Sequence, residues 1–219
     1  MILGRMQALL ARLYDAPVEH DVENFLVSSR DRLAALAGPE AHGDADEQVF
    51  VVENDNDVRV GLFIAPEVLE RLQRRDPLDR LDDDNLPDYC TALEGVSHFH
   101  YLMWSLAHGR NVSLLELELQ ADVDKYASAL TLFTQQRNGM FPAALHARLF
   151  HRVRYLPELS AESRRRYEVA NRHAAHFCRS LEERFLRRRS QRPEAFLSEL
   201  RRFFRCGHQE KLRDGCRLG

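Results

Sequence analysis

The chain lacks a hydrophobic run long enough to cross a membrane. None of its apolar stretches approaches the roughly 20 residues that span a bilayer, although 44% of its 219 residues are hydrophobic. The N-terminal segment, residues 2–14, is apolar at helical spacing and is interrupted by Arg5 and Gln7, whereas the core of a signal peptide is continuous. We therefore expect an amphipathic N-terminal helix, no export signal and no membrane segment.

Closely spaced cysteines are also missing. The sequence has four cysteines, none of them in a Cys-x-x-Cys pair: Cys90, Cys178, Cys206 and Cys216. Their wide separation is unlike the ligand spacing of a structural zinc finger. Without an export signal, unpaired cysteines predict reduced thiols and a cytoplasmic protein.

The motifs of several enzyme classes do not occur. The sequence contains no glycine-rich phosphate-binding loop and no Gly-x-Ser-x-Gly segment, and no cysteine stands with a histidine in a recognisable catalytic motif. Nucleotide hydrolysis and thiol catalysis are therefore without support from the sequence.

Lysine is scarce, and the charges are unevenly distributed. Only Lys125 and Lys211 accompany 29 arginines. Residues 1–142 hold 12 basic and 25 acidic side chains, a net charge of −13, whereas residues 143–219 hold 19 and 9, a net charge of +10. Such a split favours either an acidic half that faces a basic half or a basic surface kept for a partner.

The composition and the apolar spacing predict the fold class. With 30% charged residues the chain is typical of globular proteins. Apolar residues recur at helical spacing through most of the sequence, so we predict a mostly α, single-domain helical bundle of seven or eight helices over residues 1–207, with a flexible tail at 208–219. Asp15 and Pro17 are signals for the start of a second helix. Gly38 is the signal for its end.

A β-hairpin is predicted near residues 48–64. Gln48–Glu53 and Val58–Ile64 are rich in β-branched and aromatic residues, and they flank a turn of Asn and Asp at residues 54–57. Because an isolated hairpin is marginally stable in water, this one must pack on the helices or gain a further strand.

The most informative stretch is Glu94–Lys125, which we interpret as a buried helix, a short break and a second helix. Glu94 and His98 are four residues apart and so share a face of the first helix. Glu118 and Asp122 share a face of the second helix in the same way. The register between the two helices decides whether these pairs meet.

If the two faces meet, they form a cluster of three carboxylates and one histidine: Glu94, His98, Glu118 and Asp122. Such a cluster can hold a divalent metal, or it can poise His98 as a base beside a carboxylate, with Glu94 and His98 as catalytic candidates. The spacing here is Glu-x-x-x-His, whereas di-iron bundles repeat Glu-x-x-His. The alternative is a core histidine hydrogen-bonded to Glu94, with Glu118–Lys125 forming ion pairs on a helix surface.

The basic C-terminal region raises a nucleic-acid hypothesis. Its arginines gather in four clusters, 148–154, 164–166, 184–192 and 201–205, which could follow phosphates. Arg166 and His173 also satisfy the loose Arg-x6-His spacing seen in HEPN-type helical ribonucleases, in which both groups act on a phosphodiester at a dimer interface. With 29 arginines such a match is expected by chance, and Tyr167 departs from the polar residue usual after the arginine. Glutamates interleaved with the arginines favour ion-paired helices instead.

Three functions follow from the sequence. The first is a non-catalytic interaction or regulatory module that binds a protein partner or a second copy of itself through its acidic and basic faces. The second is a small helical-bundle enzyme with a divalent metal at Glu94, His98, Glu118 and Asp122. The third is an RNA-binding or HEPN-like protein that acts through the C-terminal helices. The sequence favours the first, and it names no substrate.

Overall fold

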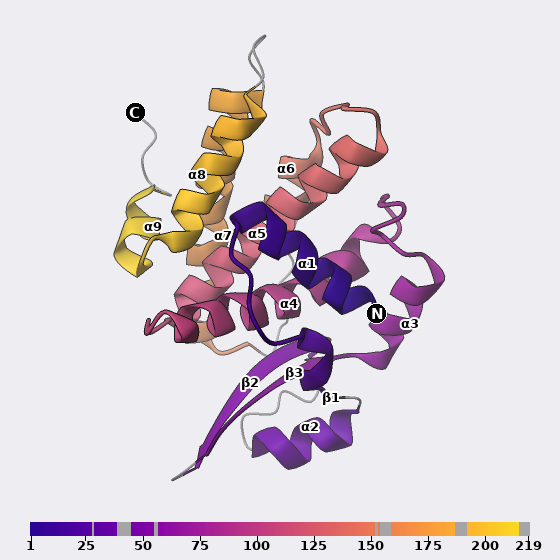
Figure 1. The fold of residues 1–219 in the computed structure, drawn as a ribbon, viewed down its shortest axis with the longest axis vertical. Helices are drawn as coiled ribbons and strands as arrows, with labels where there is room; N and C mark the ends of the chain where they lie inside the picture. The colour runs from indigo at the N-terminus through magenta and orange to yellow at the C-terminus, as the bar shows by residue number, and fades with distance from the viewer. Residues whose placement is uncertain are drawn as a thin grey trace.

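In the computed structural model, the chain forms a helical body with a small sheet against one side (Figure 1). The structure describes residues 1–27, 29–38, 45–54, 57–151, 153, 159–186 and 192–214, with residues 53, 54, 57, 58 and 214 described only through their backbone. The helices within these ranges are α1 (Ile2–Tyr14), η1 (Val22–Phe25), α2 (Arg30–Ala37), α3 (Pro66–Arg74), α4 (Leu86–Ala107), α5 (Leu114–Gln136), α6 (Leu145–Phe150), α7 (Ala161–Leu181), the π-helical turn η3 (Glu182–Leu186), α8 (Pro193–Arg205) and α9 (His208–Asp214). The strands are β1 (Leu26–Val27), β2 (Glu47–Asn54) and β3 (Asp57–Ile64). The predicted fold class, mostly α with one inserted hairpin, is confirmed.

The core of the molecule is built around α5. This helix packs against α4 on one side and α7 on another, while α1 contacts both α4 and α5 and is itself covered by α8 (Figure 1). Because α4 and α5 are enclosed by neighbours, apolar residues are buried around most of their circumference, as expected for central helices. A buried polar atom on these two helices is therefore costly unless it has a partner inside the protein.

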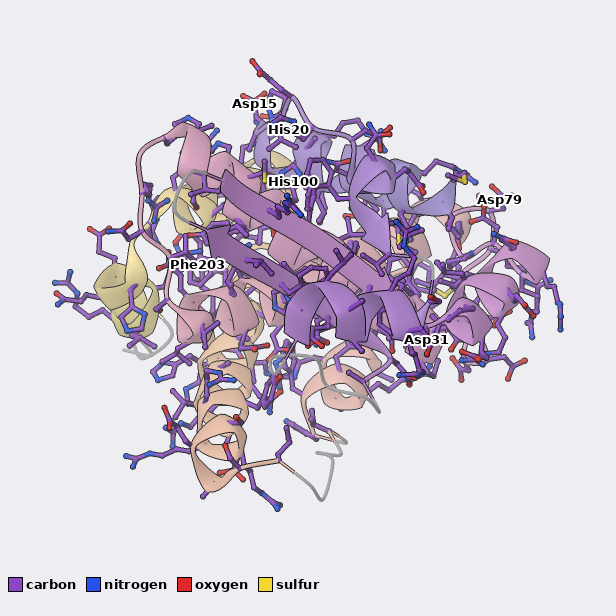
Figure 2. The ribbon with its side chains drawn as sticks, turned by 90° about the horizontal axis from the view of Figure 1, so that it is seen from below. Asp15, His20, Asp31, Asp79, His100 and Phe203 are labelled. Atoms are coloured by element: carbon purple, nitrogen blue, oxygen red, sulfur yellow. The ribbon has the colours of Figure 1, made fainter. Side chains whose placement is uncertain are left out.

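The sheet has the order β1-β3-β2, and the predicted hairpin is its larger part. β2 and β3 pair antiparallel from Glu47–Ile64 to Asn54–Asp57. Alternation along β3 directs Leu62 and Ile64 toward α4, whereas Phe63 lies on the other face, beneath the guanidinium of Arg30. Helix α2 lies across that second face (Figure 2), so the sheet is covered on both sides.

The helix predicted from Pro17 to Gly38 is wrong. The structure has the short turn η1, the strand β1 and the helix α2 in this region. Leu26 and Val27 pair in parallel with Leu62 and Phe63, so the free edge of β3 supplies hydrogen bonds that a continuous helix would have formed internally. Ser29 then starts α2 anew, because its hydroxyl accepts a hydrogen bond from the backbone N–H of Arg32.

The C-terminal region also differs from the predicted flexible tail. Residues 208–214 form helix α9, and Lys211 is completely buried. The Lys211 ammonium donates a hydrogen bond to Gln120 Oε1 at 2.6 Å and lies 4.0 Å from the ring centre of Tyr101. These partners come from distant parts of the chain, which explains why local sequence did not reveal the helix. Residues 215–219 of the predicted tail lie outside the described residues.

Gly95 permits the close contact between the sheet and α4. A Cβ atom at this position would lie 2.6 Å from Leu62 Cδ1 and 2.8 Å from Glu47 Oε2, closer than real Cβ atoms approach such neighbours. A glycine inside a helix costs about 1 kcal/mol relative to alanine. Here the missing side chain allows β2 and β3 to rest directly on the helix.

We predict that Gly95→Ala destabilises the protein even though alanine is the better helix former. The added methyl group must displace buried side chains of β2 and β3, and overpacking of this kind costs about 1–3 kcal/mol. Urea unfolding measures the change. Gly4→Ala is the matched control, because its Cβ would meet its nearest neighbour at an ordinary 3.6 Å. Because alanine also improves the helix propensity at both positions, the packing cost is the difference between the two variants, and equal changes of stability in Gly95→Ala and Gly4→Ala would contradict it.

Candidate functional site

Four ionisable side chains meet where α4, α5 and β2 come together. Glu94 and His98 lie on successive turns of α4, Glu118 lies in α5, and Glu47 is the first residue of β2. The Nε2 atom of His98 is 3.5 Å from Glu118 Oε2, and its Nδ1 atom is 3.8 Å from Glu47 Oε1. Both nitrogens of the imidazole ring therefore face a carboxylate.

The structure brings together three of the four metal ligands expected from the sequence. One donor atom from each of Glu94, His98 and Glu118 lies within 4.8 Å of the other two. Asp122 points instead at Lys125, whose Nζ atom is 2.8 Å from Asp122 Oδ1 and 2.9 Å from Glu94 Oε2. Glu94 thus stands between the histidine and the lysine, and Asp122 belongs to the lysine side.

The sequence analysis missed Glu47. This residue reaches His98 only because the sheet docks over Gly95, and the spacing of residues along the chain carries no sign of that contact. The one available signal was the glycine itself, since an interior glycine in a buried helix often marks the close approach of another backbone or side chain.

Local signals in the sequence explain why the other ligands are well placed. Pro87 stands in the first turn of α4, where its missing N–H costs nothing. Ser113 caps α5, with its hydroxyl accepting the backbone N–H of Glu116 at 3.2 Å. The cap fixes the start of α5, so Glu118 sits little more than one turn into a well-anchored helix.

The cluster is buried and contains polar atoms that lack partners. The side chains of His98 and Glu118 are 9% and 10% exposed. Among the described residues, His98 Nε2, Glu47 Oε2 and Arg166 Nε are buried without a hydrogen-bond partner. Arg166 comes from α7, and its Nε atom lies 3.9 Å from Glu118 Oε1. A buried polar atom without a partner is costly, and three of the nine such atoms among the described residues belong to side chains that meet at this cluster.

The carboxylates control the protonation of His98. Burial by itself disfavours the charged imidazole, but the contact with Glu118 and the negative charges of Glu47 and Glu94 outweigh burial and raise the His98 pKa to about 9. For Glu47, burial raises the pKa to about 8, with the neighbouring carboxylates adding to the shift. For Glu94, Lys125 and His98 overcome the effect of burial and lower the pKa.

The carboxylates of a second polar cluster in the same helices are hydrogen-bonded to neighbouring side chains. The Asp124 carboxylate, fully buried, accepts hydrogen bonds from Tyr14, from Ser97 at 2.6 Å and from Gln120 at 2.6 Å. Glu116 accepts hydrogen bonds from Tyr101 and Arg110. Glu116, Gln120 and Asp124 form a polar stripe on α5 separate from Glu118 and Asp122, and the hydrogen bonds of its carboxylates indicate a structural role.

The two residues of the HEPN-like spacing have different surroundings. Arg166 faces Glu118 at the cluster, whereas His173 lies near the backbone of Leu212 in α9. Seven residues of helix separate their Cα atoms by about 10 Å along the axis. Other arginines of the basic region form ion pairs with a glutamate four residues on, as Arg164 does with Glu168 within α7 and Arg179 with Glu183 at the start of η3.

Comparisons with known proteins give no further guide. No family model matches the sequence, and neither the curated proteins nor the solved structures contain a match. Within the part of the chain that the structure describes, no helix combines the length and the apolar character that a membrane crossing requires.

We predict that Glu118→Gln lowers the pKa of His98 by at least about one unit in the metal-free protein, because a neutral amide no longer favours the imidazolium. An NMR titration of the His98 ring protons measures the shift. Glu116→Gln is the control, since this buried carboxylate of α5 binds Tyr101 and Arg110 and should leave the His98 pKa unchanged.

The same shift makes stability depend on pH. The folded-state pKa of His98, about 9, lies above the value of about 6.5 expected in the unfolded chain. The interactions of the imidazolium therefore stabilise the fold fully below about pH 6.5, and this contribution is lost as the pH rises through about 9. In the metal-free protein, the loss of stability in His98→Gln should be larger at about pH 6 than at about pH 10. An equal loss at both pH values would contradict the assignment.

Proposed function

We propose that the protein is a metal-dependent helical enzyme that binds one divalent transition-metal ion through Glu94, His98 and Glu118. The observation that carries this proposal is that one donor atom from each of Glu94, His98 and Glu118 lies within 4.8 Å of the other two. In addition, the buried His98 Nε2 atom has no hydrogen-bond partner among the described residues. The alternative from the sequence, a core histidine hydrogen-bonded to Glu94, does not describe these contacts, because His98 Nε2 faces Glu118 Oε2 at 3.5 Å.

The donor set fits the chemistry of zinc, manganese or ferrous iron. Imidazole with two carboxylates suits these ions, whereas calcium and magnesium prefer a shell of oxygen atoms. Glu47 faces His98 Nδ1, the position from which a carboxylate orients a metal-bound histidine. Three protein ligands leave a coordination position for water, and an ion bound in this way supplies Lewis-acid activation of that water or of a carbonyl or phosphoryl oxygen.

The proposal includes a cytoplasmic location. Cys90, Cys178 and Cys206 are free thiols, which supports a reducing compartment. A nucleophilic role for Cys90 is not part of the proposal, because burial raises the pKa of its thiol to about 12 and so suppresses the reactive thiolate.

A second candidate is the interaction module, and one observation favours it. Leu106 and Leu114 flank the turn between α4 and α5, and they are 53% and 60% exposed. Large apolar side chains at one exposed helical turn can contact a protein partner or a second copy of the chain. Replacing both by glutamate should abolish capture of such a partner, or dissociate a dimer in sedimentation analysis, if this candidate is correct.

We predict that purified protein contains about one equivalent of a transition metal and that His98→Gln loses it, since the histidine nitrogen is the one non-oxygen ligand. Elemental analysis by mass spectrometry measures the content, and circular dichroism verifies the fold. His100→Gln is the matched control, because His100 is a buried histidine of the same helix that stands outside the cluster. Metal content that is equal in His98→Gln and His100→Gln would exclude the site.

We further predict an order among the carboxylates. Glu118→Gln should lose the metal, Asp122→Asn should retain it because Asp122 binds Lys125, and Glu47→Gln should weaken binding about 10–100-fold as an orienting residue. Competition with a metal-sensitive chelating dye measures the affinities. Loss of metal in Asp122→Asn together with retention in Glu118→Gln would show that the ion sits on the lysine side of Glu94 instead.

A further inference from the structure

A cavity of about 320 Å³ lies beside the cluster of Glu94, His98 and Glu118. Three helices line it. The described lining residues are Leu86, Pro87 and Cys90 of α4, Asp122 and Lys125 of α5, and Arg148, Leu149 and Phe150 of α6. A volume of this size admits a small organic molecule.

The cavity and the cluster share a wall. Cys90, Glu94 and His98 stand on successive turns of α4, so the lining of the cavity continues directly into the cluster. Lys125 lines the cavity, and its ammonium also contacts Glu94 Oε2 at 2.9 Å. A molecule bound in the cavity would therefore lie against Lys125, whose ammonium contacts a proposed metal ligand.

Lys125 has a hydrogen-bond donor to spare. A lysine ammonium carries three N–H donors. Among the described residues, Glu94 and Asp122 take one each. Because the side chain borders the cavity, the third donor is available to a ligand there.

Arg148 supplies a second cationic group at the cavity. Its guanidinium pairs with Asp83, whose side chain is 72% exposed. Ion pairs at the surface contribute little to stability, so an anionic ligand can replace Asp83 at small cost. Lys125 is paired with Asp122 and with Glu94, but Glu94 is a ligand of the proposed metal, so a bound divalent ion would offset its charge. In the metal-loaded protein, the described lining then sets Lys125 and Arg148 against Asp122, which favours an anion. Leu149 and Phe150 provide an apolar wall next to these charges.

Building on the proposed metal centre, we propose that this cavity is the substrate site and that it takes a small organic anion. Its carboxylate or phosphate head group lies between Lys125 and Arg148, and its apolar body packs on Leu149 and Phe150.

The test is calorimetric titration of the full, metal-loaded chain with phenyl phosphate, benzoate and benzyl alcohol. Saturable binding of phenyl phosphate or benzoate, with benzyl alcohol at least tenfold weaker, is expected. The tighter of the two anions identifies the head group as phosphate or carboxylate. Arg148→Gln should weaken the anion at least tenfold and leave the metal content unchanged, whereas Arg164→Gln, which removes an arginine paired with Glu168 on α7, should leave both unchanged. Amide NMR shifts on titration should concentrate at Cys90, Lys125 and Leu149.

Two results would overturn the inference. One is equal anion affinity in Arg148→Gln and the wild type. The other is a metal-loaded protein that binds neither anion, a result that would exclude the anion site without contradicting the proposed metal site. Anion binding by a chain that takes up no metal would support the cavity as an anion site and overturn the proposed function instead.

Discussion

The contact between β3 and α4 over Gly95 is the constraint on which the candidate site depends. Without a side chain at this position, Leu62 and Ile64 reach the central helix and the sheet closes one side of the helical body. The same contact carries the first residue of β2 inward, so that Glu47 faces one nitrogen of His98 while Glu118 faces the other. A single packing event thus serves both the core and the site. A glycine inside a helix costs about 1 kcal/mol. This cost is small beside the free energy gained when the apolar side chains of the docked sheet are removed from water.

The central helices bury two groups of carboxylates, and the groups differ in how well they are satisfied. Asp124 accepts three side-chain hydrogen bonds, and Glu116 accepts two, so desolvation of these charges is compensated. Around His98, the ion pairs of His98 with Glu118 and Glu47 and of Arg166 with Glu118 are long, at 3.5–3.9 Å. Three buried polar atoms of these side chains have no hydrogen-bond partner among the described residues. The hydrogen-bonded carboxylates Asp124 and Glu116 are explained by their contribution to stability. The incompletely hydrogen-bonded side chains around His98 are explained better by a ligand, because polar groups are left unsatisfied most often at functional sites.

Much of the fold followed from periodicity, and what failed depended on contacts between distant segments. Helical spacing placed Glu94 with His98 on one face, and antiparallel packing of α4 and α5 brought Glu118 to them. The same spacing grouped Asp122 with Glu118, but Lys125 lies between Asp122 and Glu94 and holds Asp122 apart, which the face of a helix alone does not predict. The segment from Pro17 to Gly38 has a helical pattern, but it is not one helix, because Leu26 and Val27 pair with the free edge of β3. Glu47 and the buried Lys211 could not be found from local sequence, since each depends on a partner dozens of residues away.

The most direct test of the central claim is anomalous X-ray diffraction from crystals grown with manganese or zinc, recorded on both sides of the absorption edge of the metal. If Glu94, His98 and Glu118 hold the ion, one strong anomalous peak is expected within about 2.0–2.2 Å of a carboxylate oxygen of Glu94, the Nε2 atom of His98 and a carboxylate oxygen of Glu118, with Glu47 hydrogen-bonded to Nδ1. A structure with no peak in the cluster, and with His98 hydrogen-bonded to Glu118 instead, would contradict the metal site. His98 would then be a structural histidine of the core.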